Sequence, residues 1–290
     1  MFSKSHLKKN FSEFLTFYKN RPIKNNQSGM KIDHCYALFN LLKKIKPKYV
    51  IESGVWKGQT TWLIKNVLKN SKVYSIDIDL SQRDLIYKDV KYLEKDITKY
   101  NWSKLDKNKT LIIFDDHVCF SKRLNFIKKN KFKHLIFDDN LPNHHISYYT
   151  PKMINENQYL VKKEFIKYTN FFRLIKFTIR FLKKDFKNNT KINIFNKYLR
   201  IVYPAKNNEK LKKDFDIFRK NIKIYYEFPP IIKFNYKKRF KKLLNNFKSD
   251  IPKNYKVKLP IFSNSEIHLP KELKNELNVQ YSNICYIKLI

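Results

Sequence analysis

The sequence predicts an α/β protein with a doubly wound, mostly parallel sheet and a basic helical insertion in its C-terminal half. Three observations lead to this class. Strand-like and helix-like segments alternate through the first half of the chain, a glycine-containing loop joins the first strand to the next helix, and acidic residues follow several predicted strands. The carboxyl ends of parallel strands meet at one edge of a sheet, where ligands of such folds bind.

The first predicted helix has a polar start and an apolar face. Asp33 can cap its first turn, apolar side chains recur at helical spacing through Lys44, and Pro47 ends it. Short apolar runs then mark the strands. The predicted strands cover Tyr49–Ile51, Lys72–Asp79, Val90–Ile97, Thr110–His117, Lys133–Asn140, Ile222–Tyr226 and Asn283–Ile290. Helices are predicted after the first strand, with apolar spacing from Trp62 to Leu68, and over Ser121–Lys129.

Glycine is rare in this chain, and its positions are informative. Only three glycines occur in 290 residues, whereas average usage would supply roughly 20. Gly54 and Gly58 stand four apart in the loop between the first predicted strand and its helix. Because glycine lacks a side chain and tolerates positive φ, this pattern indicates a backbone that passes close to a ligand.

The composition is that of a folded and strongly basic protein. The formal net charge is +37, and 42% of the residues are hydrophobic, which is ample for a packed core. Lysine, asparagine, isoleucine and phenylalanine are abundant at the expense of glycine and alanine, as expected from an AT-rich genome. The charge alone is therefore weak evidence for nucleic-acid binding.

The cysteines and the N-terminus predict a cytoplasmic location, with membrane association left open. Cys35, Cys119 and Cys285 lie far apart without a CxxC or zinc-type spacing, so we expect reduced thiols. The first residues lack the apolar core of a signal peptide. No apolar run approaches the length that crosses a bilayer.

The segment Glu52–Gly58 resembles the first motif of the class I S-adenosylmethionine (SAM)-dependent methyltransferases, an acidic residue followed by two glycines four apart. The resemblance implies a Rossmann-like fold, SAM as cofactor and an acidic residue at the end of the second strand that holds the ribose. Asp77 takes that role, with Asp79 as the alternative strand end. The implied cofactor-binding residues are Glu52, Gly54, Gly58, Thr60, Asp77, Asp96 and Asp115.

The ends of the fourth and fifth predicted strands resemble the divalent-metal site of catechol O-methyltransferase and related sugar O-methyltransferases. The resemblance implies a metal, expected to be Mg²⁺, bound by Asp116, Asp139 and Asn140. Hard oxygen ligands of this kind suit Mg²⁺, which would acidify a substrate hydroxyl. Without a metal, Asp115, Asp116, Asp138 and Asp139 would repel one another unless solvent or lysines neutralise them.

The catalytic base departs from the catechol-type pattern. Those enzymes place a lysine two residues after the histidine, and here that position is Cys119. His117 and Lys122 are the candidates that replace it, which gives Asp116, His117 and Lys122 as the implied catalytic residues. A wider stretch, Arg21–Met30 and Glu52–Asn140, resembles a group of largely uncharacterised methyltransferase-like proteins. That resemblance covers about the first half of the chain and extends to Tyr226–Pro230.

Four segments make up the predicted organisation. They are an N-terminal helical segment (1–46), a SAM-binding α/β core (47–150), a basic and aromatic insertion or lid (151–221) and a C-terminal part that completes the sheet (222–290). The last part could supply the antiparallel end of a methyltransferase sheet. Basic residues recur at helical spacing over Phe165–Lys184, which suits either an anionic membrane surface or glycan, or a lid helix whose lysines face water.

We therefore expect metal-assisted O-methylation of a small-molecule or glycan hydroxyl. One alternative is a metal-dependent hydroxylase or hydrolase that uses the same carboxylates without a methyl donor, and the joint presence of Glu52, Gly54, Gly58 and Asp77 argues against it. The other is a basic nucleic-acid-binding protein. The fourth strand ends in Asp-Asp-His and lacks the motifs of nucleic-acid methyltransferases, which disfavours specific nucleic-acid binding.

Overall fold

The computed structural model describes residues 1–26, 29–140, 149–157, 209–232, 259–263, 265–270, 272–273, 276–277 and 284–290. The described chain falls into two compact units. The first contains Met1–Val118, Leu124–Asn140 and Asn221–Ile290, and the second contains Cys119–Arg123 and Leu141–Lys220. The predicted basic helical face over Phe165–Lys184 lies outside the described residues.

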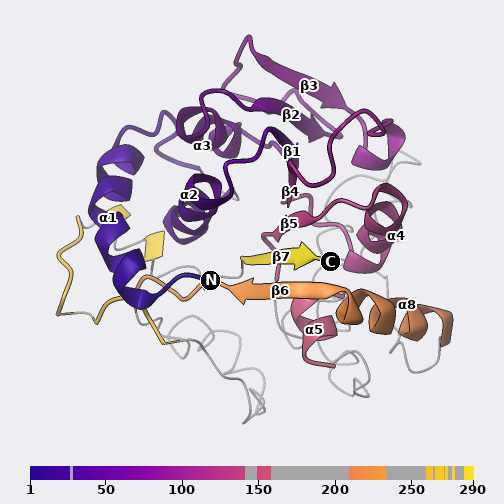
Figure 1. Cartoon of the computed structure of the whole chain (residues 1–290). Coiled ribbons are helices and arrows are strands. Elements are labelled where there is room, and N and C mark those ends of the chain that lie inside the picture. Colours follow the sequence, from indigo (N-terminus) through magenta and orange to yellow (C-terminus); the bar gives the residue numbers. More distant parts are fainter. Residues whose placement is uncertain are drawn as a thin grey trace, which may run out of the picture. The chain divides into compact units, whose positions relative to one another are not determined.

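A seven-stranded sheet of order β3-β2-β1-β4-β5-β7-β6 forms the centre of the first unit (Figure 1). The strands are β1 (Tyr49–Ser53), β2 (Lys72–Asp77), β3 (Val90–Glu94), β4 (Thr110–Phe114), β5 (His134–Phe137), β6 (Ile222–Glu227) and β7 (Cys285–Leu289). Neighbours from β3 through β5 pair in parallel, whereas β7 pairs antiparallel with both β5 and β6. The doubly wound, mostly parallel sheet is confirmed, including the antiparallel end that the methyltransferase resemblance implied.

Helices cover both faces of this sheet. The helices are α1 (Lys4–Lys19), α2 (Ile32–Ile45), α3 (Gln59–Val67), the 3-10 turn η1 (Ile97–Lys99) and α4 (Phe120–Asn130). The first three share one core cluster with Leu111 and Ile113 of β4. Side chains alternate across a strand, and Phe114 instead contacts Phe126 of α4 at 6.4 Å between ring centroids. Hence α4 lies against the opposite face.

Aromatic packing holds the N-terminal helices together. Phe14 lies 4.9 Å and Phe11 5.1 Å from the Tyr36 ring, measured between centroids, and all three side chains are buried. Each fully buried large apolar side chain contributes about 1.5–3 kcal/mol. The N-terminal helical segment is therefore part of the same core as the sheet.

The second unit contains two described helices, α5 (Pro151–Asn155) and α8 (Glu209–Lys220). Phe215 packs on Tyr149, and Phe218 on Phe120, each with ring centroids 4.9 Å apart. Within the described part of the chain, no helix has the length and apolarity needed to cross a membrane. Cys35, Cys119 and Cys285 are free thiols, as expected.

Several predicted boundaries are wrong in informative ways. Asp33 does not cap α2, because the helix begins at Ile32 and Asp33 lies buried in its first turn. The strands β2, β3, β4 and β5 end at Asp77, Glu94, Phe114 and Phe137, two to three residues earlier than predicted. For β4 and β5, the polar residues after the apolar run leave the ladder and form loops at the carboxyl edge.

Candidate functional site

The loop after β1 has left-handed backbone at both of its glycines. Gly54 has φ +100° and Gly58 has φ +91°. A Cβ on Gly54 would lie 2.2 Å from the carbonyl oxygen of Asp115, whereas one on Gly58 would lie 3.2 Å from that of Leu85. The glycine at position 54 is thus required by the neighbouring β4 backbone. The sequence-based reason, close approach of a ligand, is not needed to explain it.

Asp77, at the end of β2, holds this loop in place. Its Oδ2 accepts hydrogen bonds from the backbone N–H groups of Val55 at 2.8 Å and Trp56 at 3.1 Å. Its Oδ1 accepts only a long bond of 3.3 Å from the N–H of Asp79. Asp77 is therefore the residue at the strand end, and Asp79 lies exposed beyond it.

Glu52 braces the loop from inside the protein. Its side chain is fully buried, and Oε2 accepts hydrogen bonds from Thr61 at 2.6 Å and Ser75 at 2.5 Å. Burial raises the pKa of Glu52 to about 7, although both hydroxyl groups lower it. Thr60 is also buried, with 5% of its surface exposed. Glu52 and Thr60 therefore both lie in the interior, and Glu52 joins β1 to α3 and β2.

The carboxyl ends of β4 and β5 bring four aspartates together. Burial raises the pKa of Asp115 well above its usual range, and the charges of Asp138 and Asp139 raise it further. Asp115 therefore keeps its proton to a higher pH than an ordinary aspartate does, which relieves part of the repulsion expected from the sequence.

Protein partners hold the other two aspartates. Asp116 Oδ2 accepts a hydrogen bond of 2.5 Å from the Ser53 hydroxyl, and Oδ1 accepts one of 3.2 Å from the N–H of Val118. Asp139 pairs with His117, whose backbone is left-handed at φ +52°. This pairing raises the pKa of His117 to about 9. The ring is therefore protonated at neutral pH and is no base in this arrangement.

Asn140 is buried and faces β6. Its Nδ2 donates to the hydroxyl oxygen of Tyr225 at 2.9 Å and to Oε1 of Glu227 at 3.3 Å. The Tyr225 hydroxyl in turn donates to Glu227 Oε1 at 2.6 Å. The amide nitrogen is thus committed to β6, and the amide oxygen faces away from these two partners.

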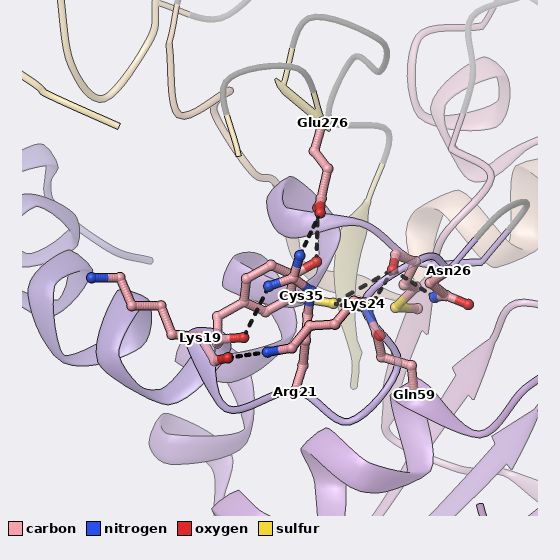
Figure 2. A network of polar contacts seen from close by, with 9 residues as sticks. Lys19, Arg21, Lys24, Asn26, Cys35, Gln59 and Glu276 are labelled. Carbon is pink, nitrogen blue, oxygen red and sulfur yellow. Dashed lines mark hydrogen bonds and ion pairs between the residues drawn. The ribbon is translucent and has the colours of Figure 1, made fainter. Parts of the chain in front are cut away.

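A network of polar contacts lies around the segment before α2 (Figure 2). The backbone oxygen of Met30 accepts hydrogen bonds from Gln59 Nε2 at 3.1 Å and Asn26 Nδ2 at 3.0 Å. Arg21, which is 5% exposed, pairs with Glu276 at 2.8 Å. These contacts fix the segment before α2 against the first residue of α3.

His34 connects α2 to the acidic edge. Its Nδ1 lies 2.5 Å from Asp138 Oδ1, and both side chains are buried. The pair meets the distance of an ion pair, although that oxygen has no partner in hydrogen-bond geometry. This contact joins α2 to the carboxyl end of β5.

Two further predicted residues belong to other elements. Asp96 caps η1, accepting hydrogen bonds at Oδ1 from the backbone and hydroxyl of Thr98 at 2.9 and 2.7 Å. Lys122 is in the first turn of α4 and belongs to the second compact unit. The roles of Asp96 at the adenine and Lys122 as base stay predictions.

The predicted metal ligands supply the right donor atoms. Asp116, Asp139 and Asn140 offer carboxylate and amide oxygens at two adjacent strand ends, as Mg²⁺ prefers. The orientation of Asn140, with its nitrogen bound to β6, agrees with this use. Among the described residues no group of three or more His, Cys, Asp and Glu side chains is arranged to hold a metal ion. Metal binding would therefore require the Asn140 amide oxygen as a ligand and the release of Asp139 from His117.

Sequence reasoning missed four residues of this site. They are His34, Ser53, Tyr225 and Glu227. The alternation of β6 could have placed Tyr225 and Glu227 on one face, because they are two residues apart in a strand. The pairings with β4 and β5 depend on packing between distant segments.

No family model matches this sequence, and no curated protein matches it. Similar solved structures include the plantazolicin methyltransferase BpumL in complex with a pentazolic desmethylPZN analog and SAH (S-adenosylhomocysteine), at 11% identity and a TM-score of 0.37, covering 99% of this chain and 96% of that one. An O-methyltransferase from Bacillus cereus in complex with SAH matches at 13% identity and a TM-score of 0.32, over 48% of this chain and 68% of that one.

A CmcI structure with Mg and SAM is also similar, at 16% identity and a TM-score of 0.34 over 43% of this chain. The chain spans 63% and 65% of the length of two CmcI chains that it matches. A likeness at these TM-scores carries no argument about activity. The residues of the site are therefore the basis for assigning a function.

Proposed function

We propose that this chain is a SAM-dependent methyltransferase that acts on a hydroxyl group of a small-molecule or glycan acceptor. The observation that carries the proposal is the loop from Gly54 to Gly58. It leaves β1 with left-handed backbone, is held by the carboxylate at the end of β2, and lies at the acidic carboxyl edge of a doubly wound sheet. Cofactors of such folds bind at this edge.

Different residues of the site would bind different parts of SAM. Bound SAM would supply an electrophilic methyl group on a sulfonium sulfur. The loop ends at Gly58, the N-cap of α3, where the backbone N–H groups of the first helical turn can donate to a polar ligand. Asp77 keeps the loop closed through Oδ2 and has Oδ1 for ribose hydroxyl groups, consistent with the role that the resemblance implies.

Methyl transfer to a hydroxyl requires that the acceptor oxygen gain a methyl group and lose a proton. Because His117 is protonated beside Asp139, its role in this arrangement is to hold a positive charge at the acidic edge. The proton acceptor is then Lys122, or His117 after Asp139 has released it. This choice remains part of the proposal.

The proposal also includes a divalent metal that assists the reaction. Asp116, Asp139 and Asn140 would hold a divalent cation, which would lower the pKa of a bound hydroxyl group. Asp139 would exchange His117 for the cation. Metal binding is thus expected to compete with protonated His117 and to strengthen as the pH rises through 9.

Calorimetry with SAH tests the proposal. We expect SAH to bind the wild-type chain, with Asp77→Ala weakening the affinity at least tenfold, the equivalent of about 1.4 kcal/mol. Asp79→Ala is the matched control, because Asp79 is exposed and its carboxylate accepts hydrogen bonds from Ser81 instead of from the loop. Absence of SAH binding by a folded wild-type protein would contradict the methyltransferase assignment. If Mg²⁺ still bound, the carboxylate-only hydroxylase or hydrolase would replace it.

A further inference from the structure

The C-terminal strand β6 delivers two polar side chains to the acidic edge. Because β7 is antiparallel to both β5 and β6, β6 runs in the same direction as β1 to β5. Cys285 of β7 pairs with Phe137, the last residue of β5, and with Glu227, the last residue of β6. Glu227 therefore ends its strand in the same row as β5, directly before the acidic residues that follow Phe137.

Strand alternation aims Tyr225 and Glu227 at the same face. The intervening residue, Tyr226, points to the other face, where its hydroxyl group contacts the backbone oxygen of Phe2 and its ring packs on Phe228. Tyr225 and Glu227 instead meet Asn140. The two faces of β6 are thus divided between the hydrophobic core and the site.

The hydrogen bonds on the site face fix the orientation of the Asn140 amide. The Tyr225 hydroxyl group donates its one proton to Glu227 at 2.6 Å, so its oxygen can only accept a hydrogen bond from Asn140. Glu227 Oε1 also accepts from the same amide nitrogen, at 3.3 Å. A flipped amide would place its oxygen against two acceptors in a site where Asn140 is 3% exposed. Such a buried mismatch disfavours the flipped amide.

We propose that Tyr225 and Glu227 are positioning residues that make Asn140 present its amide oxygen to a divalent cation. The inference rests on the metal-assisted form of the proposed function and adds to it the two residues that orient one ligand. Outer partners of this kind commonly decide how well a ligand binds its metal. Neither residue needs to contact the cation.

Binding of Mn²⁺ to the full chain, without SAM, tests the inference. The variants are Tyr225→Phe and Glu227→Gln, measured by calorimetry and by the electron paramagnetic resonance of free Mn²⁺. Each should weaken the affinity about 10-fold or more. Tyr286→Phe is the matched control, because it removes a phenol hydrogen bond of 2.6 Å to His134 on the same sheet, at the opposite end of β5. It should leave Mn²⁺ affinity unchanged.

A rescue variant separates orientation from general damage to the fold. Asn140→Asp combined with Glu227→Gln should restore most of the Mn²⁺ affinity, since a carboxylate offers an oxygen in either orientation. In one outcome the wild type binds Mn²⁺, while Tyr225→Phe and Glu227→Gln weaken this binding no more than Tyr286→Phe does. That result would overturn the positioning role but would leave the metal proposal standing. A wild-type protein that ignores millimolar Mn²⁺ would overturn both.

Discussion

Replacing Gly54 by alanine tests whether this position serves the fold itself. The added Cβ would lie 2.2 Å from the oxygen and 2.5 Å from the carbon of the Asp115 carbonyl group. Both atoms belong to the backbone at the end of β4, so no side-chain rotation can relieve the contact. The β4 loop, which carries Asp115 and Asp116, would have to move.

Two contributions set the size of the effect. A non-glycine residue at φ +100° stores about 1–3 kcal/mol of strain. Forcing an additional methyl group into a filled site costs about another 1–3 kcal/mol. The sum of about 2–6 kcal/mol is a large part of the stability of a typical domain, about 5–15 kcal/mol. Gly54→Ala should therefore unfold at markedly lower urea concentration.

Gly58→Ala is the internal control for this experiment. It has a similar backbone strain at φ +91°, but its Cβ would lie 3.2 Å from the nearest atom, the Leu85 oxygen. Urea unfolding followed by circular dichroism should show Gly54→Ala to be less stable than Gly58→Ala, by about 1–3 kcal/mol. Equal stability of the two variants, with SAH binding lost only in Gly54→Ala, would refute this reasoning and return the glycine to a ligand-contact role.

Three further predictions follow from the site. Asp77→Ala should destabilise the fold by about 1.5–3 kcal/mol in urea unfolding, because two backbone N–H groups lose a charged acceptor. The exposed control Asp79→Ala should change the free energy of unfolding by less than about 0.5 kcal/mol. Equal effects of the two variants would mean that Asp77 does not hold the loop. Glu52 has a folded pKa of about 7 against an ordinary value of 4.5, so the folded state holds its proton longer and stability falls as the pH rises from about 4.5 to 7. Glu52→Gln should remove this part of the slope in pH-dependent unfolding, and an unchanged slope would contradict the raised pKa. Asp139→Ala should lower the pKa of His117 from about 9 in an NMR titration. The same variant should abolish the rise in melting temperature that Mg²⁺ gives the wild type. A wild-type melting temperature that does not change with Mg²⁺, together with activity that EDTA does not affect, would argue against the metal.

The sequence by itself determined the class of fold and the edge at which chemistry can occur. Apolar runs such as Leu111–Phe114 are long enough for one buried strand and are followed by polar residues, so both the strand and its end can be read locally. Parallel strands then bring their carboxyl ends together whatever their exact lengths. The glycine loop and the acidic clusters were therefore placed at one edge before any contact was known.

Tertiary structure alone decided what each of these residues contacts. Gly54 is needed because the backbone of β4 runs against β1, and Asp77 holds a loop that belongs to the preceding strand. Asn140 is oriented by Tyr225 and Glu227, which reach it only because β7 lies between β5 and β6. Such partners come from segments far apart in the chain, and local sequence patterns carry no record of which segments pack together.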